Sequence, residues 1–137
     1  MFVPFRASMA LSRAPAPLFT PFHLFFSDFS RILEREIIRF GILGAGRIGK
    51  VHTATVGASS RAKVAFVADA MAKAANDLAA TVGAKVASVE EIIASKEVDA
   101  ILIATPTGTH ADLIEAASNA GKAILCEKPV SLSVDRI

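Results

Sequence analysis

The chain has 137 residues, 53% of them hydrophobic, and a formal net charge of +2. This length accommodates one domain of ordinary size, and no stretch approaches the roughly 20 uninterrupted apolar residues of a membrane span, which argues against a membrane partner. Residues 1–35 contribute the whole excess of positive charge, and the remaining 11 basic and 11 acidic residues are scattered, so we expect no nucleic-acid partner.

The single cysteine, Cys126, cannot form an internal disulfide, which is typical of a reducing compartment and predicts a cytoplasmic protein. The chain has only three histidines besides, so no cluster of metal ligands is visible and we expect no metal site. We interpret Cys126 as a small buried hydrophobe rather than as a reactive thiol.

Residues 1–35 differ in kind from the rest of the chain. They contain seven of the nine phenylalanines and four of the six prolines, and neither helical nor strand periodicity persists among them. We predict an irregular arm. One interpretation is a targeting peptide, because the segment contains Arg and Ser and is poor in acidic residues. The interpretation that we prefer is non-native sequence, read from a start codon upstream of the real one, since a strand already begins at residue 37.

From Glu36 onward, short apolar runs alternate with Ala-rich segments of helical period. Gly83 and Gly121 end two helices, and Ser131 or Ser133 is placed to cap a last one. The predicted strands are 37–43, 63–68, 85–87, 100–104 and 123–126, and the predicted helices are 48–57, 70–82, 89–95 and 111–120. Strands that are apolar on both faces and alternate with helices predict an α/β fold over residues 36–137, a doubly wound parallel sheet of the Rossmann type.

Between the first predicted strand and the first helix, the sequence matches the pattern G-x-G-x-x-G with Gly44, Ala45, Gly46, Arg47, Ile48 and Gly49. Gly44 permits the tight turn, Gly46 lets the backbone approach a pyrophosphate, and Gly49 allows close packing of helix and strand. Free N–H groups at the helix start then face the phosphates. The turn predicts a dinucleotide site. Arg47 either reaches a phosphate or is solvated.

Asp69 ends the second predicted strand, twenty residues beyond Gly49. A carboxylate at this place accepts hydrogen bonds from the adenosine ribose hydroxyls. It favours NAD over NADP, because a 2′-phosphate would meet a like charge. The alternative is that Asp69 only caps the helix that follows it.

Three segments together resemble a known family. They read Gly-Ile-Leu-Gly-Ala-Gly-Arg-Ile-Gly-Lys-Val-His at 41–52, Ala-Thr-Pro-Thr-Gly-Thr-His at 104–110, and Glu-Lys-Pro at 127–129. Each segment lies at the C-terminal end of a predicted parallel strand, the edge where open α/β sheets bind ligands. In these motifs residues 38–137 resemble the Gfo/Idh/MocA oxidoreductases, the glucose–fructose oxidoreductase and inositol dehydrogenase family, and look most like bacterial inositol 2-dehydrogenases.

The resemblance implies roles for residues at two of these strand ends. Lys128 is implied as the active-site lysine, which hydrogen-bonds the reacting hydroxyl and the cofactor ribose. A lysine suits this chemistry, because oxidation of a secondary alcohol needs its proton removed and the developing alkoxide stabilised. The other residues implied to bind the cofactor are Ala104, Thr105, Pro106, His110 and Glu127. From the residues alone, His52 and His110 are best interpreted as polar packing at helix starts.

Family members continue into an α+β domain with the substrate pocket and the oligomer interface. The resemblance therefore implies that the Rossmann sheet is truncated before its last strand and that this second domain is missing. It also implies a polyol substrate, with myo-inositol favoured, and homo-oligomers among full-length relatives. We expect the strand at 123–126 to be an unpaired sheet edge through which the chain self-associates.

Two classes of function remain open. The first is an oxidoreductase whose sequence is truncated, inactive by itself, and the second is a small module that binds or senses NAD without chemistry. The presence of a lysine motif that serves only catalysis favours the first.

Overall fold

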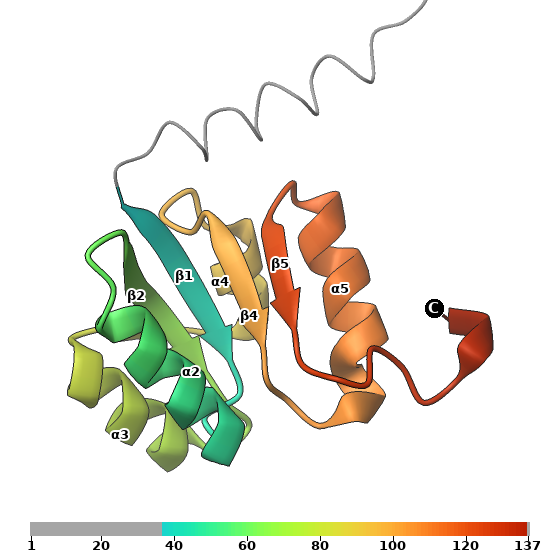
Figure 1. Ribbon diagram of the computed structural model, residues 1–137, viewed down its shortest axis with the longest axis horizontal. Helices are drawn as coiled ribbons and strands as arrows, with labels where there is room; N and C mark the ends of the chain where they lie inside the picture. Colours follow the sequence, from blue (N-terminus) through green and yellow to red (C-terminus); the bar gives the residue numbers. More distant parts are fainter. Residues whose placement is uncertain (1–36, 137) are drawn as a thin grey trace, which may run out of the picture.

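Five parallel strands form one sheet in the order β3-β2-β1-β4-β5 (Figure 1). The computed structural model describes residues 37–136, so the arm predicted for residues 1–35 lies outside the described residues. The strands are β1 (Ile38–Leu43), β2 (Ala62–Ala68), β3 (Lys85–Val86), β4 (Ala100–Ile103) and β5 (Ala123–Cys126). The helices are α2 (Arg47–Gly57), α3 (Ala72–Val82), α4 (Val89–Ala94) and α5 (His110–Asn119), with 3₁₀ turns η1 (Thr107–Thr109) and η2 (Val134–Arg136). The doubly wound α/β fold predicted from the sequence is confirmed.

Helices cover both faces of the sheet, with α2 and α3 on one side and α4 and α5 on the other (Figure 1). Ile42 and Leu102 point from the central strands into the first layer, where Leu78 of α3 meets them. Leu43 and Ile101 point into the second layer and pack with Ile92 of α4. All six of these residues are at most 4% exposed, as expected when a parallel sheet is buried on both faces.

Local signals set most of the helix ends. Gly83 and Gly121 adopt the left-handed conformation after α3 and α5, with φ values of +67° and +68°, which confirms both as helix stops. Helix α4 begins with a capping box, in which Ser88 Oγ accepts from the Glu91 N–H and the Glu91 carboxylate accepts from the Ser88 N–H.

The predicted start of one helix was wrong by two residues, and the expected last helix is not formed among the described residues. Helix α3 begins at Ala72 rather than at residue 70, because the Asp69 carboxylate accepts a hydrogen bond from the Met71 N–H and holds the preceding residues in a turn. Within the described residues no α-helix follows the last strand. Ser131 Oγ instead accepts from the Ser133 N–H, and a single 3₁₀ turn follows at η2.

An ion pair joins β1 to the start of β4 at the amino-terminal ends of the strands, opposite the glycine turn. Arg39 Nε lies 2.9 Å and Arg39 Nη2 lies 3.0 Å from the two Asp99 oxygens, and the Arg39 backbone N–H also donates to this carboxylate. The Asp99 N–H returns a hydrogen bond to the Arg39 carbonyl. The hydrogen bond to Asp99 raises the pKa of the Arg39 guanidinium, so the pair remains charged.

Strand β5 lies at one edge of the sheet and, among the described residues, pairs with β4 alone. Its Leu125 side chain is 51% exposed. At the opposite edge, β3 is only two residues long. No helix in residues 37–136 is long and apolar enough to cross a membrane.

Candidate functional site

The glycine turn between β1 and α2 is built by close backbone contact. Gly44 has a φ of +104°, and a Cβ there would lie 2.5 Å from the Ala104 carbonyl oxygen of the neighbouring strand end. A Cβ on Gly49 would overlap the Gly44 carbonyl oxygen, so α2 approaches the turn as closely as its backbone allows. A Cβ on Gly46 would meet nothing within 4 Å, which leaves open space on that side of the turn. This is the cradle that a pyrophosphate needs.

The first turn of α2 leaves its backbone donors available for an anion. Gly46 is the N-cap residue and has no side chain to accept from them, and the first turn contains no acidic residue. The positive end of the helix dipole points to the same place. Arg47 and Ile48 lie on the exposed surface of this turn.

Asp69 lies directly beside the glycine turn. Its Oδ2 accepts a 2.7 Å hydrogen bond from the Ala45 N–H, and its Oδ1 accepts a 2.8 Å hydrogen bond from the Met71 N–H. Neither bond caps α3, whose own N-cap residue is Met71. Each carboxylate oxygen has a further lone pair, so the group can still accept from a hydroxyl pair.

The segment after β4 lies against Gly44 on the other side of the turn. The Ala104 N–H donates to the Leu43 carbonyl, which extends the β1–β4 pairing by one hydrogen bond. Thr105 Oγ1 lies 2.7 Å from Thr109 Oγ1, which in turn donates to the Pro106 carbonyl. These bonds fix the loop between β4 and α5 at the carboxyl edge of the sheet.

The Glu-Lys-Pro segment follows β5 at this same edge. The Glu127 N–H donates to the Ile103 carbonyl, and Glu127 Oε1 lies 2.5 Å from Nε2 of His52 on α2. The other carboxylate oxygen accepts from the Lys128 N–H. The hydrogen bond from His52 lowers the pKa of Glu127, with the Lys128 N–H as the second cause. The Lys128–Pro129 peptide bond is cis, and the Lys128 side chain is exposed.

His110 is buried at the start of α5, with a relative exposure of 1%. Its Nε2 lies 2.8 Å from the Thr105 carbonyl oxygen, and its Nδ1 lies 2.9 Å from the Pro129 carbonyl oxygen. Both partners are acceptors, so the ring donates to both at once only when both nitrogens carry hydrogen. No polar atom of His110 is left to touch a cofactor directly, and any effect on binding must pass through the two backbone segments.

The carboxyl ends of four parallel strands thus meet around one turn. The model of the Gfo/Idh/MocA family, an oxidoreductase family with an NAD-binding Rossmann fold, matches residues 38–137. The chain belongs to the Gfo/Idh/MocA family. An inositol 2-dehydrogenase of Rhizobium meliloti is 50% identical over 100 residues, which cover 73% of this chain and 30% of the relative.

Solved structures of inositol dehydrogenases are similar to this chain. The crystal structure of a myo-inositol dehydrogenase from Corynebacterium glutamicum is 38% identical, with a TM-score of 0.70 over 73% of this chain and 30% of that one. A scyllo-inositol dehydrogenase from Lactobacillus casei, solved with NAD(H) and scyllo-inositol, is 28% identical, with a TM-score of 0.68 over 73% of this chain and 30% of that one. This chain is an NAD-binding oxidoreductase domain related to inositol dehydrogenases, and it spans about 30% of the length of these relatives.

Sequence reasoning found the Gfo/Idh/MocA motifs but missed what connects them. His52 and His110 were interpreted as polar packing, and the structure gives each a defined partner in the Glu-Lys-Pro segment.

Burial raises the pKa of the Cys126 thiol and Glu127 adds to the rise, so the thiol stays protonated at neutral pH. Among residues 37–136 no group of three or more His, Cys, Asp or Glu side chains is arranged to hold a metal ion.

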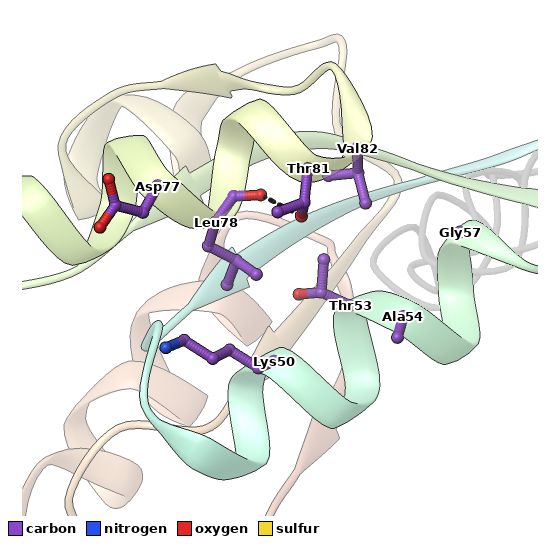
Figure 2. Close-up of a pocket in the computed structure, with 8 residues that line it drawn as sticks. All are labelled: Lys50, Thr53, Ala54, Gly57, Asp77, Leu78, Thr81 and Val82. Carbon is purple, nitrogen blue, oxygen red and sulfur yellow. Dashed lines mark hydrogen bonds between the residues drawn. The ribbon is translucent and has the colours of Figure 1, made fainter.

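A separate cleft of about 680 Å³ lies between α2 and α3 (Figure 2). Lys50, Thr53 and Gly57 line it from α2, and Asp77, Leu78 and Thr81 line it from α3. No residue of the predicted cofactor site is among those that line the cleft. The strand ends, and not this cleft, therefore form the candidate site of the Gfo/Idh/MocA domain.

Proposed function

We propose that this chain is the nucleotide-binding part of an NAD-dependent dehydrogenase that oxidises a secondary alcohol of a polyol, myo-inositol to 2-keto-inositol. The observation that carries the proposal is the place of Lys128. It follows β5 at the carboxyl edge of the sheet, where Glu127 joins it to α2 and thus to the glycine turn. The 50% identity to a protein named inositol 2-dehydrogenase supports the substrate class.

The residues present fit a dinucleotide. The open side of Gly46 and the uncapped N–H groups of α2 would receive the pyrophosphate. Asp69 would receive the adenosine ribose hydroxyls. Ala104, Thr105 and Pro106 would line the nicotinamide side of the cofactor site together with Glu127 and Lys128. When bound, NAD supplies the hydride acceptor for the reaction.

Lys128 would act on the oxygen of the alcohol. Its exposed ammonium group would lie beside the reacting hydroxyl, where a positive charge stabilises the developing alkoxide and assists removal of the proton. Hydride transfer also requires the alcohol to be held in a near-attack geometry. Among the described residues Lys128 is the one catalytic residue that we assign, so we expect no measurable polyol oxidation by the 137-residue chain.

Calorimetric titration of the purified 137-residue chain with NAD and with NADP tests the cofactor part of the proposal. We expect weak binding of NAD and still weaker binding of NADP. Tighter binding of NADP, or binding of neither, would contradict it. Formation of NADH from NAD and myo-inositol by the same chain would contradict the expected lack of turnover.

Joining the chain to the second domain of the Rhizobium meliloti relative tests the catalytic part. We expect oxidation of myo-inositol by the joined protein, and loss of most of that activity in its Lys128→Ala variant. If the joined protein folds and binds NAD but oxidises no polyol, a non-catalytic NAD-binding or sensing module becomes the better description.

A further inference from the structure

Lys128 lies between two residues that are each hydrogen-bonded to a histidine of a different helix. On one side, Glu127 is bonded to His52 of α2, and on the other, Pro129 is bonded to His110 of α5. The two helices lie on opposite faces of the sheet, so the segment after β5 is held from both layers of the domain (Figure 1).

The bond on the α2 side links Lys128 to the phosphate-binding turn. His52 lies one helical turn beyond Gly49, on the helix whose N-terminus faces the open side of Gly46. The carboxylate of Glu127 uses one oxygen for His52 and the other for the Lys128 backbone N–H. A shift of His52 would therefore be transmitted to the backbone of Lys128 through a single side chain.

The bond on the α5 side links Lys128 to the loop after β4. Because His110 is 1% exposed, its ring is held in place by packing as well as by hydrogen bonding to the backbone. It spans the Thr105 carbonyl, in the loop that lies against Gly44, and the Pro129 carbonyl, one residue beyond Lys128. The ring thus lies between the two loops, and the tautomer with hydrogen on Nδ1 donates to the Pro129 carbonyl.

We propose that His52 and His110 are positioning residues that together fix the backbone on both sides of Lys128 relative to the glycine turn. The proposal rests on the proposed function only in assigning Lys128 to the reaction. The histidines themselves touch neither substrate nor reacting atoms. They act through Glu127 and Pro129.

The test uses the ¹⁵N-labelled 137-residue chain and two readouts, the backbone order parameter of the Lys128 amide and the affinity for NAD. His52→Leu removes the donor to Glu127, and His52→Gln restores an N–H near the position of Nε2. The His110 variants separate its two bonds. His110→Asn keeps a donor near the Nδ1 position for Pro129, and His110→Gln keeps one near the Nε2 position for Thr105.

We expect an order parameter near the ~0.85 of rigid backbone in the parent chain and in His52→Gln and His110→Asn, and a value below about 0.6 in His52→Leu and His110→Gln. The affinity for NAD should fall about two- to tenfold in the latter two, the range that net loss of one hydrogen bond gives. Thermal unfolding of each variant shows whether it is folded. If either His110 variant fails to fold, the two His52 variants alone decide.

Order parameters of the Lys128 amide that stay unchanged in His52→Leu and in His110→Gln would overturn the proposal. It would also be overturned if the order parameter fell as far in His52→Gln as in His52→Leu, or as far in His110→Asn as in His110→Gln. Failure of the proposed function has a different signature. In that case the parent chain does not bind NAD, while the order parameters still report whether the histidines fix Lys128.

Discussion

The glycine turn and the Glu-Lys-Pro segment lie at one edge of the same sheet, but they are held in opposite ways. The turn is fixed by missing side chains, since Gly44 and Gly49 bring backbone atoms into direct contact. The segment around Lys128 is fixed by side chains that reach it from α2 and α5. The first region depends on backbone packing of one short segment, including against Ala104, and the second on side chains from two distant helices. Substitutions in the two regions should therefore act for different reasons, by steric overlap in the glycine turn and by loss of hydrogen bonds around Lys128.

The largest loss of stability is expected from a substitution inside the glycine turn. Gly49→Ala places a Cβ against the Gly44 carbonyl, and we expect a loss of about 2–3 kcal/mol in unfolding free energy from the overpacking. For a domain of this size, the melting temperature should fall by roughly 10–20 °C. Thermal unfolding followed by circular dichroism measures it.

Gly46→Ala is the matched control within the same turn. Its Cβ would meet no atom of the protein within 4 Å, so the stability should change by less than about 0.5 kcal/mol. It would, however, occupy the space proposed for the pyrophosphate, so the affinity for NAD should fall. Equal destabilisation by the two substitutions would break the distinction between the packed and the open side of the turn.

The next largest effect is a change in cofactor preference, and it is expected at Asp69, which joins the glycine turn to the loop after β2. Asp69→Ala should narrow the preference for NAD over NADP, by about tenfold if removal of the charge changes the difference in binding free energy by about 1.4 kcal/mol. Asp69→Asn is the control, because it removes the charge but keeps an oxygen that can accept from the Ala45 N–H. Calorimetry with both cofactors measures the preference. An unchanged ratio in both variants would remove Asp69 from cofactor selection.

A smaller effect, visible as a pH dependence, is expected in the Glu-Lys-Pro segment. The pKa of Glu127 is lower in the folded protein than its ordinary value of 4.5, so its contribution to stability is present above that value. It is lost as the pH falls through the lowered folded pKa. Glu127→Gln should therefore destabilise the chain at pH 7, and the difference from the parent should shrink in acid.

Denaturant unfolding at a series of pH values measures this difference. Glu115→Gln is the control, since Glu115 lies on the exposed surface of α5, where its side chain is 71% exposed. A difference between parent and Glu127→Gln that stays constant from neutral to acid pH would show that the His52–Glu127 bond contributes no charge-dependent stability.

The smallest effect on stability is expected at the two edges of the sheet. Leu125 is 51% exposed on β5 and is flanked in the strand by apolar residues, which makes this edge a template for strand addition. Leu125→Lys should reduce self-association of the 137-residue chain in light scattering, with less than about 0.5 kcal/mol change in stability. Val86→Lys, on the two-residue β3 at the other edge, should change neither. A parent chain that remains monomeric as its concentration rises would contradict this prediction.

The contrast between the two regions also explains how far the sequence was informative. The glycine turn, Asp69 and the helix stops at Gly83 and Gly121 could be predicted, because each is specified by neighbouring residues and a preferred backbone conformation. The doubly wound parallel sheet could be predicted from the alternation of apolar strands and helices.

The interactions of the two histidines could not be predicted in this way. His52 and Glu127 are 75 positions apart, and His110 and Pro129 are 19 positions apart, so no local sequence pattern indicates either hydrogen bond. The start of α3 was wrong for a related reason. The Asp69 carboxylate accepts hydrogen bonds from the backbone N–H groups of Ala45 and Met71, and the spacing of apolar residues contains no information about these bonds.

The Arg39–Asp99 pair has a consequence for the order of events in folding. It closes a loop of 60 residues, whereas β1 and β2 are joined through α2 alone. Because closure of a longer loop costs more chain entropy, we expect β1, α2 and β2 to form the folding nucleus and β4 to dock later. The ion pair would then be absent from the transition state. Asp99→Asn should accelerate unfolding in stopped-flow measurements and leave the folding rate nearly unchanged.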